Sequence, residues 1–217
     1  MESYNTISIL GGTGDLGTGI AKKLIKANYQ VIIGSRKLES AKNSALKLGS
    51  SVIGLTNREA AAKASIIILT VPFSYQEGVI KDCYEEIQGK IFVDTTVPLL
   101  PPKVGTVQLP ELDSAAVSAQ YILGDNVRVV SAFQNVSAEL LKIDDDIDCD
   151  VLVCGNSKDA RQDIIQVIED MGMRAWHAGQ LANSSASEAL TSVLISINRH
   201  HKIQHSGIRI TGLKSKK

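Results

Sequence analysis

The chain has 217 residues, with 23 basic and 23 acidic side chains and a hydrophobic content of 44%. This length allows one large domain, or one domain with a small addition, and this composition is sufficient for a substantial core. The formal net charge of zero gives no indication of binding to nucleic acid or to an anionic membrane surface.

The cysteines and the apolar segments indicate a protein of the reducing cytoplasm. Cys83, Cys149 and Cys154 are an odd number without a C-x-x-C pair, which argues against a disulfide framework and against a zinc site. We interpret Cys149 and Cys154 as core residues beside a buried strand. The longest apolar runs have the length of a strand, and the first residues lack a basic segment followed by an apolar one. We therefore expect a cytoplasmic protein.

Strand and helix patterns alternate through the first half of the chain. Apolar segments predict strands at residues 6–10, 30–34, 51–54, 65–71 and 90–94. Helical periodicity predicts helices at residues 15–28, 38–48, 58–63 and 75–87, the third of them introduced by Asn57. Repeated strand–helix units with continuously apolar strands imply a parallel sheet that helices cover on both faces.

The pattern changes at residues 95–110, which contain four prolines and are expected to form a loop. Beyond this loop we predict helices at residues 112–123, 158–171 and 181–201, with a short helix after residues 134–137. Strands are expected at residues 128–131, 150–154 and 173–176, with a final strand at 207–211. The acidic run of residues 144–148 is interpreted as a solvated linker. The predicted organisation is a Rossmann-like domain, doubly wound around a parallel sheet, at 1–144 and a small C-terminal α/β unit at 145–217.

A glycine-rich loop connects the first strand to the first helix. Gly12, Gly14 and Gly17 form the pattern G-x-G-x-x-G, which binds dinucleotides when it lies between a strand and a helix. Gly12 permits the tight turn, Gly14 allows the backbone to approach a pyrophosphate, and Gly17 allows the helix to pack close to the strand. Thr13 offers a hydroxyl donor, whereas the carboxylate of Asp15 is expected to point away from the phosphates.

The residues after the second strand indicate which dinucleotide binds. An NAD-binding chain usually carries Asp or Glu about 20 residues beyond the loop, to accept the ribose 2′-hydroxyl. This chain has Ser35 and Arg36 at that point, followed by Lys37. A guanidinium grips phosphate oxygens with two hydrogen bonds and stacks on adenine. The sequence therefore predicts NADP.

Val71, Pro72 and Phe73 end the fourth strand at the carboxyl edge of the sheet, where the nicotinamide ribose is expected. Pro72 also has a purely structural interpretation, because proline ends strands. His201 and His205 have the spacing of two metal ligands, but further ligands have no evident source, and a solvated helix end is favoured. No nucleophile or acid–base pair is evident, as expected for hydride transfer between two bound cofactors.

Several short segments resemble those of the F420-dependent NADP reductases over about residues 5–213. They are Gly11-Gly12-Thr13-Gly14-Asp15-Leu16-Gly17, Gly34-Ser35-Arg36, Val71-Pro72, Thr96-Val97-Pro98, Val130-Ser131-Ala132, Cys154-Gly155, Ala178-Gly179 and Glu188-Ala189-Leu190-Thr191. The resemblance implies a homodimer that transfers a hydride between NADP(H) and the deazaflavin coenzyme F420.

The resemblance also implies which residues bind the two cofactors. NADP would contact Gly12, Thr13, Gly14, Asp15, Leu16, Ser35 and Arg36, with Val71, Pro72 and Val97 around the nicotinamide. The deazaflavin would lie against Gln134, Asn135, Val136 and Ala138, with C5 presented to nicotinamide C4. Gln134 stands where some members carry His. Residues 181–184 and the C-terminal strand would close the pocket.

Two other functions remain open from the residues alone. One is an NADP-dependent reductase of a small imine, ketone or flavin, for which Tyr121 would be a candidate proton donor. The other is a non-catalytic NADP(H) redox sensor, with the apolar residues 190–197 as a partner surface. A dimer core would explain these apolar residues equally well.

Overall fold

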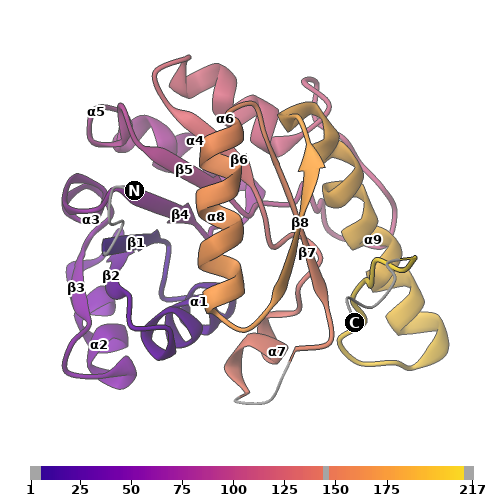
Figure 1. Cartoon of the computed structure of the whole chain (residues 1–217), viewed down its shortest axis with the longest axis horizontal. Coiled ribbons are helices and arrows are strands. Elements are labelled where there is room, and N and C mark those ends of the chain that lie inside the picture. Colours follow the sequence, from indigo (N-terminus) through magenta and orange to yellow (C-terminus); the bar gives the residue numbers. More distant parts are fainter. Residues whose placement is uncertain (1–5, 144–146, 213–217) are drawn as a thin grey trace.

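A computed structural model describes residues 6–143 and 147–212. In this part of the chain, eight strands form one sheet in the order β3-β2-β1-β4-β5-β6-β7-β8 (Figure 1). The parallel strands β1 to β6 are Thr6–Leu10, Gln30–Ser35, Ile53–Thr56, Ile66–Leu69, Ile91–Asp94 and Arg128–Ser131. The strand β7 (Asp150–Gly155) pairs antiparallel with β6, and β8 (Arg174–Gly179) pairs parallel with β7. The predicted α/β class with a doubly wound, mostly parallel sheet is confirmed.

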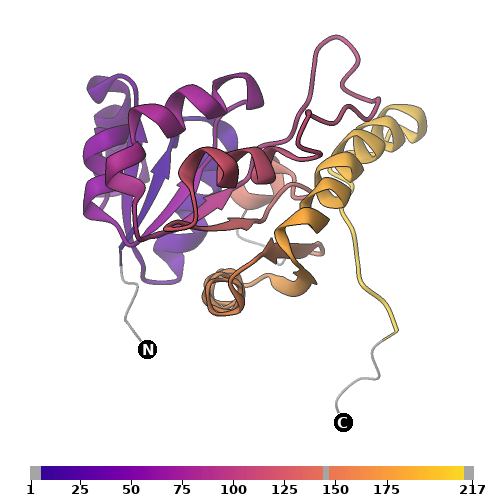
Figure 2. The same ribbon diagram turned by 90° about the horizontal axis from the view of Figure 1, so that it is seen from above.

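Helices cover both faces of the sheet, because alternate strand residues point to opposite sides (Figure 2). Ile66 and Ile68 of β4 belong to one core cluster, and Ile67 and Leu69 belong to the other. The first cluster packs against α1 (Asp15–Lys26), α2 (Leu38–Leu48), α7 (Ala138–Lys142) and α8 (Lys158–Asp170). The second packs against α3 (Asn57–Lys63), α4 (Phe73–Asp82), α5 (Tyr84–Ile87) and α6 (Ala115–Leu123).

The last helix of the described residues, α9 (Ser184–His201), follows the 3₁₀ turn η1 (Leu181–Asn183) and lies beyond the β8 edge of the sheet (Figure 1). Figure 2 shows the long loop between β5 and α6 extending toward this helix. The buried residues of α9 are mostly polar, namely Ser184, Ser187, Glu188, Ser192 and Leu194. The helix is therefore held mainly by hydrogen bonds rather than by a wide apolar face.

Several predicted boundaries are wrong for local reasons. The third strand lies at Ile53–Thr56 rather than 51–54, because the Val52 amide closes a turn onto the Gly49 carbonyl. The N-cap of α3 is Thr56 rather than Asn57, since Thr56 and Glu59 form a reciprocal capping box. The helix predicted at 75–87 is interrupted at Cys83 into α4 and α5, and α6 begins at Ala115 because the Ser114 side chain caps it.

The strand predicted at 207–211 does not form. The Asp150 amide donates to the Ile208 carbonyl at 2.8 Å, but the Ile210 amide donates to the Asp150 carboxylate at 2.7 Å. Because the second bond ends on a side chain, no backbone ladder continues along β7. The linker prediction for residues 144–148 lies partly outside the described residues, at 144–146, as does the basic tail from residue 214. The sheet continues beyond residue 145, and the division into two units there stays a prediction.

Candidate functional site

The glycine-rich loop adopts a tightly packed turn at the carboxyl edge of the sheet. The Gly12 amide donates to the Gly34 carbonyl at 3.0 Å. A Cβ on Gly12 would lie 2.7 Å from the Ile9 carbonyl oxygen, and one on Gly17 would lie 2.6 Å from the Gly12 Cα atom. A Cβ on Gly14, by contrast, would meet nothing closer than 3.9 Å. Two glycines are thus required for packing, and the third leaves open space in front of the loop.

The N-terminus of α1 opens into that space. Gly14 is its N-cap and provides no side-chain hydrogen bond to the first turn. The first amides of a helix lack internal acceptors and carry partial positive charge, so they form a site for phosphate oxygens. The residues present therefore fit a pyrophosphate.

A cavity of about 300 Å³ extends from the loop toward the end of β2. Its walls are Gly11, Thr13, Gly14, Ser35, Arg36, Asn57, Thr70, Val71, Pro72, Tyr75 and Val79. The Arg36 guanidinium carbon lies 4.9 Å from the centre of the Tyr75 ring, which holds the cation over an aromatic face. The Ser35 hydroxyl accepts a hydrogen bond from the Lys37 amide at 3.3 Å. A positioned guanidinium beside a hydroxyl suits a ribose 2′-phosphate.

A second cavity of about 400 Å³ continues from the first across the ends of β4 and β5. Gly14, Thr70, Val71 and Pro72 line both cavities. The remaining walls of the second cavity are Asp15, Leu16, Phe73, Thr95, Thr96, Val97 and Leu99. The two cavities form one trough, which brings the predicted residues at the loop, Arg36 and Val97 to the same side of the sheet. This is the edge at which open α/β sheets bind ligands.

The Asp15 carboxylate lies in an ion pair rather than free beside the phosphate site. Lys142 on α7 contacts Asp15 Oδ1 at 2.7 Å and Glu139 Oε1 at 2.7 Å. These two carboxylates raise the pKa of Lys142 through hydrogen bonding and charge. A cation from α7 therefore offsets the negative charge next to the glycine loop.

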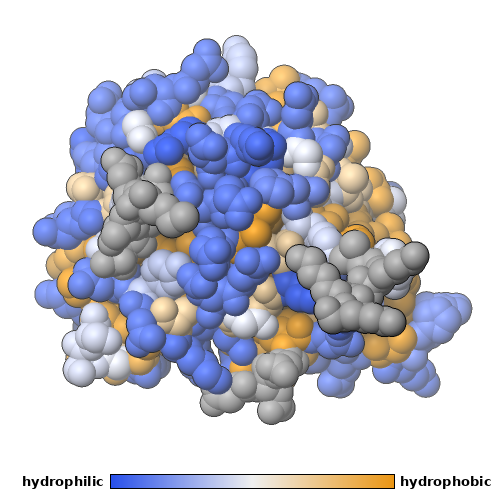
Figure 3. All heavy atoms as spheres, viewed as in Figure 1, coloured by the Kyte–Doolittle hydropathy of each residue, from blue (hydrophilic) through white to orange (hydrophobic). Residues whose placement is uncertain are grey.

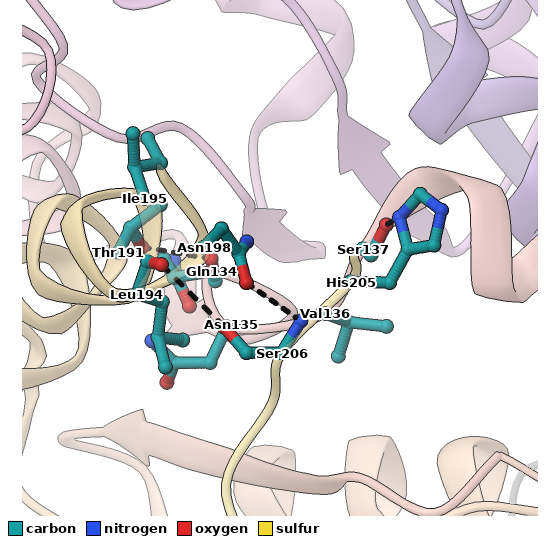
Figure 4. Close-up of a pocket in the computed structure, with 10 residues that line it drawn as sticks. All are labelled: Gln134, Asn135, Val136, Ser137, Thr191, Leu194, Ile195, Asn198, His205 and Ser206. Carbon is teal, nitrogen blue, oxygen red and sulfur yellow. Dashed lines mark hydrogen bonds between the residues drawn. The ribbon is translucent and has the colours of Figure 1, made fainter. Parts of the chain in front are cut away.

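A third cavity, of about 180 Å³, lies between the β6–α7 loop, α9 and the segment after α9 (Figure 4). Its lining residues are Gln134, Asn135, Val136, Ser137, Thr191, Leu194, Ile195, Asn198, His205 and Ser206. Hydrogen bonds join the walls: Thr191 Oγ1 donates to the Gln134 carbonyl at 2.8 Å, and Asn135 Nδ2 donates to the Ser187 carbonyl at 2.8 Å. Figure 4 shows His205 beside Ser137, where its Nδ1 lies 2.9 Å from the hydroxyl oxygen.

Three of the four residues predicted beside the deazaflavin therefore line one cavity. Ala138, the fourth, begins α7 immediately after that wall and does not line the cavity. Gln134 is only 5% exposed, and its Oε1 atom is buried without a hydrogen-bond partner in the described chain. An unpaired buried acceptor is costly, so it indicates a position for a donor from a ligand.

A buried polar network around Asp94 lies between the second and third cavities. Asp94 Oδ1 accepts hydrogen bonds from the Thr96 amide at 2.8 Å and from its hydroxyl at 2.7 Å. Gln76 Nε2 donates to the other carboxylate oxygen, and Gln134 Nε2 donates to the Asp94 carbonyl at 2.9 Å. Burial raises the pKa of Asp94 to about 6, although the hydrogen bonds from Thr96 and Gln76 oppose this shift.

Glu188 of α9 forms a second buried carboxyl site. Its two oxygens accept the Ala115 amide at 2.7 Å and the Ala116 amide at 3.2 Å, at the start of α6. Ser184 Oγ and Ser114 Oγ, 2.7 Å apart, add a further bond between the same helices. Burial raises the pKa of Glu188 to about 8, against the effect of the two amide donors. Glu188 therefore attaches α9 to the N-terminus of α6.

Sequence reasoning did not find Asn57 as a loop residue, nor Tyr75, Gln76, Asp94 and Lys142 as site residues. Asn57 Oδ1 accepts the Gly11 amide at 3.2 Å, a role that a helix-capping interpretation concealed. Asp94 could have been found from the sequence, because it ends a buried strand at the ligand-binding edge of the sheet.

In the described chain, no group of three or more His, Cys, Asp or Glu side chains could hold a metal ion. No described helix has the length and apolar character to span a membrane.

A family model described as NADP oxidoreductase coenzyme F420-dependent matches residues 6–98. The chain is 40% identical over 222 residues to the F420-dependent NADP reductase of Methanocaldococcus jannaschii, with 96% of this chain and 99% of the relative covered. A crystal structure of a candidate F420-dependent NADP reductase from Arthrobacter sp. FB24 has a TM-score of 0.81 at 20% identity, covering 95% of this chain and 99% of that one.

A more distant fold neighbour bears on one alternative function. The imine reductase of Bacillus cereus BAG3X2 has a TM-score of 0.67 at 15% identity, covering 91% of this chain but only 62% of that chain. At this identity the likeness concerns the fold alone. The imine reductase carries a large additional part for which this chain has no counterpart in the match.

Proposed function

The chain belongs to the F420-dependent NADP reductase family, and from this premise we propose that the two connected cavities bind NADP(H) and that the third cavity binds coenzyme F420. The protein is an oxidoreductase that transfers a hydride between these two cofactors. In the direction of F420 reduction, nicotinamide C4 of NADPH would supply the hydride and deazaflavin C5 would accept it, with a proton from solvent, to give NADP⁺ and reduced F420; the reverse reaction would exchange these roles.

The observation that carries the assignment of the sites is the hydrogen bond between Gln134 and the Asp94 carbonyl. It connects a wall of the third cavity to the strand whose continuation, Thr95 to Val97, lines the second. The end of β5 would therefore position both a nicotinamide in the second cavity and a deazaflavin in the third. Hydride transfer requires this kind of fixed approach between donor and acceptor carbons rather than a protein nucleophile.

Each predicted residue has a role in this proposal. Gly12, Thr13, Gly14 and Leu16 form the pyrophosphate loop, and Asp15 contributes backbone while its carboxylate pairs with Lys142. Ser35 and Arg36 bind the 2′-phosphate. Val71, Pro72 and Val97 exclude water from the nicotinamide side. Gln134, Asn135 and Val136 contact the deazaflavin, and Ala138 sets the start of α7 beside them.

We propose that the protein works as a cytoplasmic homodimer. The three cysteines are buried free thiols, as is usual in a reducing compartment. Exposed apolar residues gather on the β5–α6 loop and on α9, and Figure 3 shows hydrophobic atoms in the region of α9. They are Leu100, Val107, Leu109, Leu112, Val193 and Ile197. A patch of this kind is typical of a protein interface. Light scattering should give twice the chain mass, and a monomer mass would contradict the dimer.

The activity is tested by mixing the purified protein with NADPH and F420 without oxygen. We expect loss of the deazaflavin absorbance, with one NADPH oxidised for each F420 reduced. Offering FMN and FAD in parallel separates this function from a general flavin reductase, because turnover with these flavins alone would contradict the proposal.

A further inference from the structure

The charges of this chain are strongly segregated along the sequence. All 23 acidic residues lie at or before Glu188, whereas 6 of the 23 Lys and Arg residues follow it. Three of the four histidines also lie in this last segment of 29 residues. A neutral chain thus ends in a segment with a formal charge of +6.

The described part of this basic segment adjoins the third cavity. Thr191, Leu194, Ile195 and Asn198 line the cavity from α9 at spacings of three and four residues, which places them on one face of the helix. Lys202 is the exposed C-cap of the helix, and its left-handed backbone conformation, with φ of 53°, ends the helical face. It lies in the turn between Asn198 and His205, both of which line the cavity.

Arg199 extends from the neighbouring side of α9 to the β5–α6 loop. Its Nη1 atom lies 3.6 Å from the position that a Cβ on Gly105 would occupy. Within residues 6–143 and 147–212, neither Arg199 nor Lys202 forms an ion pair, whereas Arg209 pairs with Asp148. The two positive charges that follow the cavity-lining Asn198 along the chain thus lack a negative partner in the described residues.

The cavity itself is uncharged except for one ionisable side chain, His205. It also contains the buried Gln134 Oε1 acceptor without a partner. These walls suit a neutral ring system with a hydrogen-bonding edge, and the cations lie outside them along α9. A ligand that fills both regions would combine a polar heterocycle with a distant anionic group.

We propose that Arg199 and Lys202 bind the anionic tail of the deazaflavin whose ring occupies the third cavity. This inference rests on the proposed function, because coenzyme F420 continues from its ring through a ribityl chain into a phosphodiester and carboxylates. Basic residues at a helix C-terminus also offset the helix dipole. That effect requires charge only in the last turn, and it does not explain why acidic residues are absent from the whole segment.

The test compares F420 with the ribityl deazaflavin that lacks the phosphodiester and the carboxylates. The double variant Arg199→Glu/Lys202→Glu is measured beside the wild type, and Lys47→Glu/Lys63→Glu is the control. Both control residues are exposed on α2 and α3, at the opposite edge of the sheet from α9 (Figure 1), and their substitution changes the net charge equally. Direct binding is followed by deazaflavin fluorescence, and turnover is followed with NADPH.

We expect the Kd and KM for F420 to rise about tenfold or more in the Arg199/Lys202 variant, because attraction between these charges becomes repulsion. The values for the tail-free deazaflavin and for NADPH should change less than about twofold, and kcat with saturating F420 should be retained. The control variant should bind F420 as the wild type does.

Three results would overturn the inference. The first is that the wild type binds F420 and the tail-free compound with equal affinity. The second is that the Arg199/Lys202 variant loses the same affinity for both compounds. The third is that this variant binds F420 as tightly as the wild type does. If both deazaflavins are reduced by the wild type in any of these cases, the hydride transfer stands and only the tail site fails. If neither compound is bound or reduced by the wild type, the proposed function fails as well.

Discussion

Gln134 Nε2 lies 2.9 Å from the backbone carbonyl oxygen of Asp94, to which it donates a hydrogen bond. The side-chain carboxylate of Asp94 accepts hydrogen bonds from the amide and the hydroxyl of Thr96. Gln134 lines the cavity assigned to F420, and Thr96 lines the cavity assigned to nicotinamide. One buried residue at the end of β5 therefore positions a wall of each site.

The first prediction concerns the choice of NADP over NAD. Arg36→Ala should raise the Kd for NADP about 10-fold to 100-fold, because it removes a charge-assisted pair of hydrogen bonds from the 2′-phosphate. The Kd for NAD should change about threefold or less. Titration calorimetry with both nucleotides measures the two values, and Lys47→Ala, at an exposed position of α2, is the control for general loss of charge. An equal loss for both nucleotides would mean that Arg36 does not bind the 2′-phosphate.

The second prediction concerns Gln134. Gln134→Leu should raise the KM for F420 about tenfold with little change in the KM for NADPH, because it removes a hydrogen-bonding group from the deazaflavin cavity. Steady-state kinetics with each cofactor varied in turn checks this split. Thr191→Val removes the hydroxyl that donates to the Gln134 backbone carbonyl. This variant measures the effect of loosening the same cavity wall while the Gln134 side chain is kept. A rise in the KM for NADPH alone would contradict the assignment of the cavity.

The third prediction concerns the ion pair between Asp15 and Lys142. Lys142→Ala should weaken NADP binding several-fold, because it leaves an uncompensated carboxylate beside the phosphate site. Asp15→Asn in the same chain should restore most of the affinity. The two single variants and the double variant form a complete cycle that fluorescence titration with NADPH can measure. Additive losses in the double variant would rule out this charge compensation.

The fourth prediction concerns stability and pH. Glu188→Ala should lower the free energy of unfolding by about 3 kcal/mol, because two buried amides of α6 lose their acceptor and a cavity remains. Glu188→Gln keeps one acceptor oxygen and should cost less. Urea unfolding at one pH measures both losses.

The raised pKa of Glu188 has a defined effect on the wild type. The folded carboxyl has a pKa of about 8, against an ordinary glutamate pKa of 4.5, so between these values the folded state binds more protons than the unfolded state. The stability contributed by this group is complete below the lower value and is lost as the pH rises through the higher one. The wild type should therefore lose stability from about pH 5 to pH 8 relative to Glu188→Gln. A parallel pH dependence of the two proteins would contradict this.

Much of the nucleotide site was predictable because it is local in sequence. Gly12, Gly14 and Gly17 lie within one turn, and Arg36 follows directly on the second strand, so spacing alone indicates their roles. Tyr75 and Lys142 were not predictable in the same way. They meet Arg36 and Asp15 only after the sheet brings α4 and α7 to the loop.

The strands and helices were predictable where periodicity was strong, and they were misplaced where single side chains decide the boundary. Ser114 and Thr56 each begin a helix through one hydroxyl, and no hydrophobic pattern encodes that choice. The segment 207–211 has the composition of a strand, but the Asp150 carboxylate takes the Ile210 amide in place of a backbone partner. Contacts of this kind depend on tertiary structure.

The transfer of deuterium tests the central claim most directly. Two samples of NADPH, each with deuterium on one of the two faces of nicotinamide C4, are incubated separately with F420 and the purified protein in ordinary water. The reduced F420 is analysed by mass spectrometry and NMR. Direct hydride transfer predicts that C5 of the reduced deazaflavin retains the deuterium from one face of C4, whichever face this enzyme uses. Reduced F420 without deuterium from either labelled face, or no reduction of F420, would contradict the account.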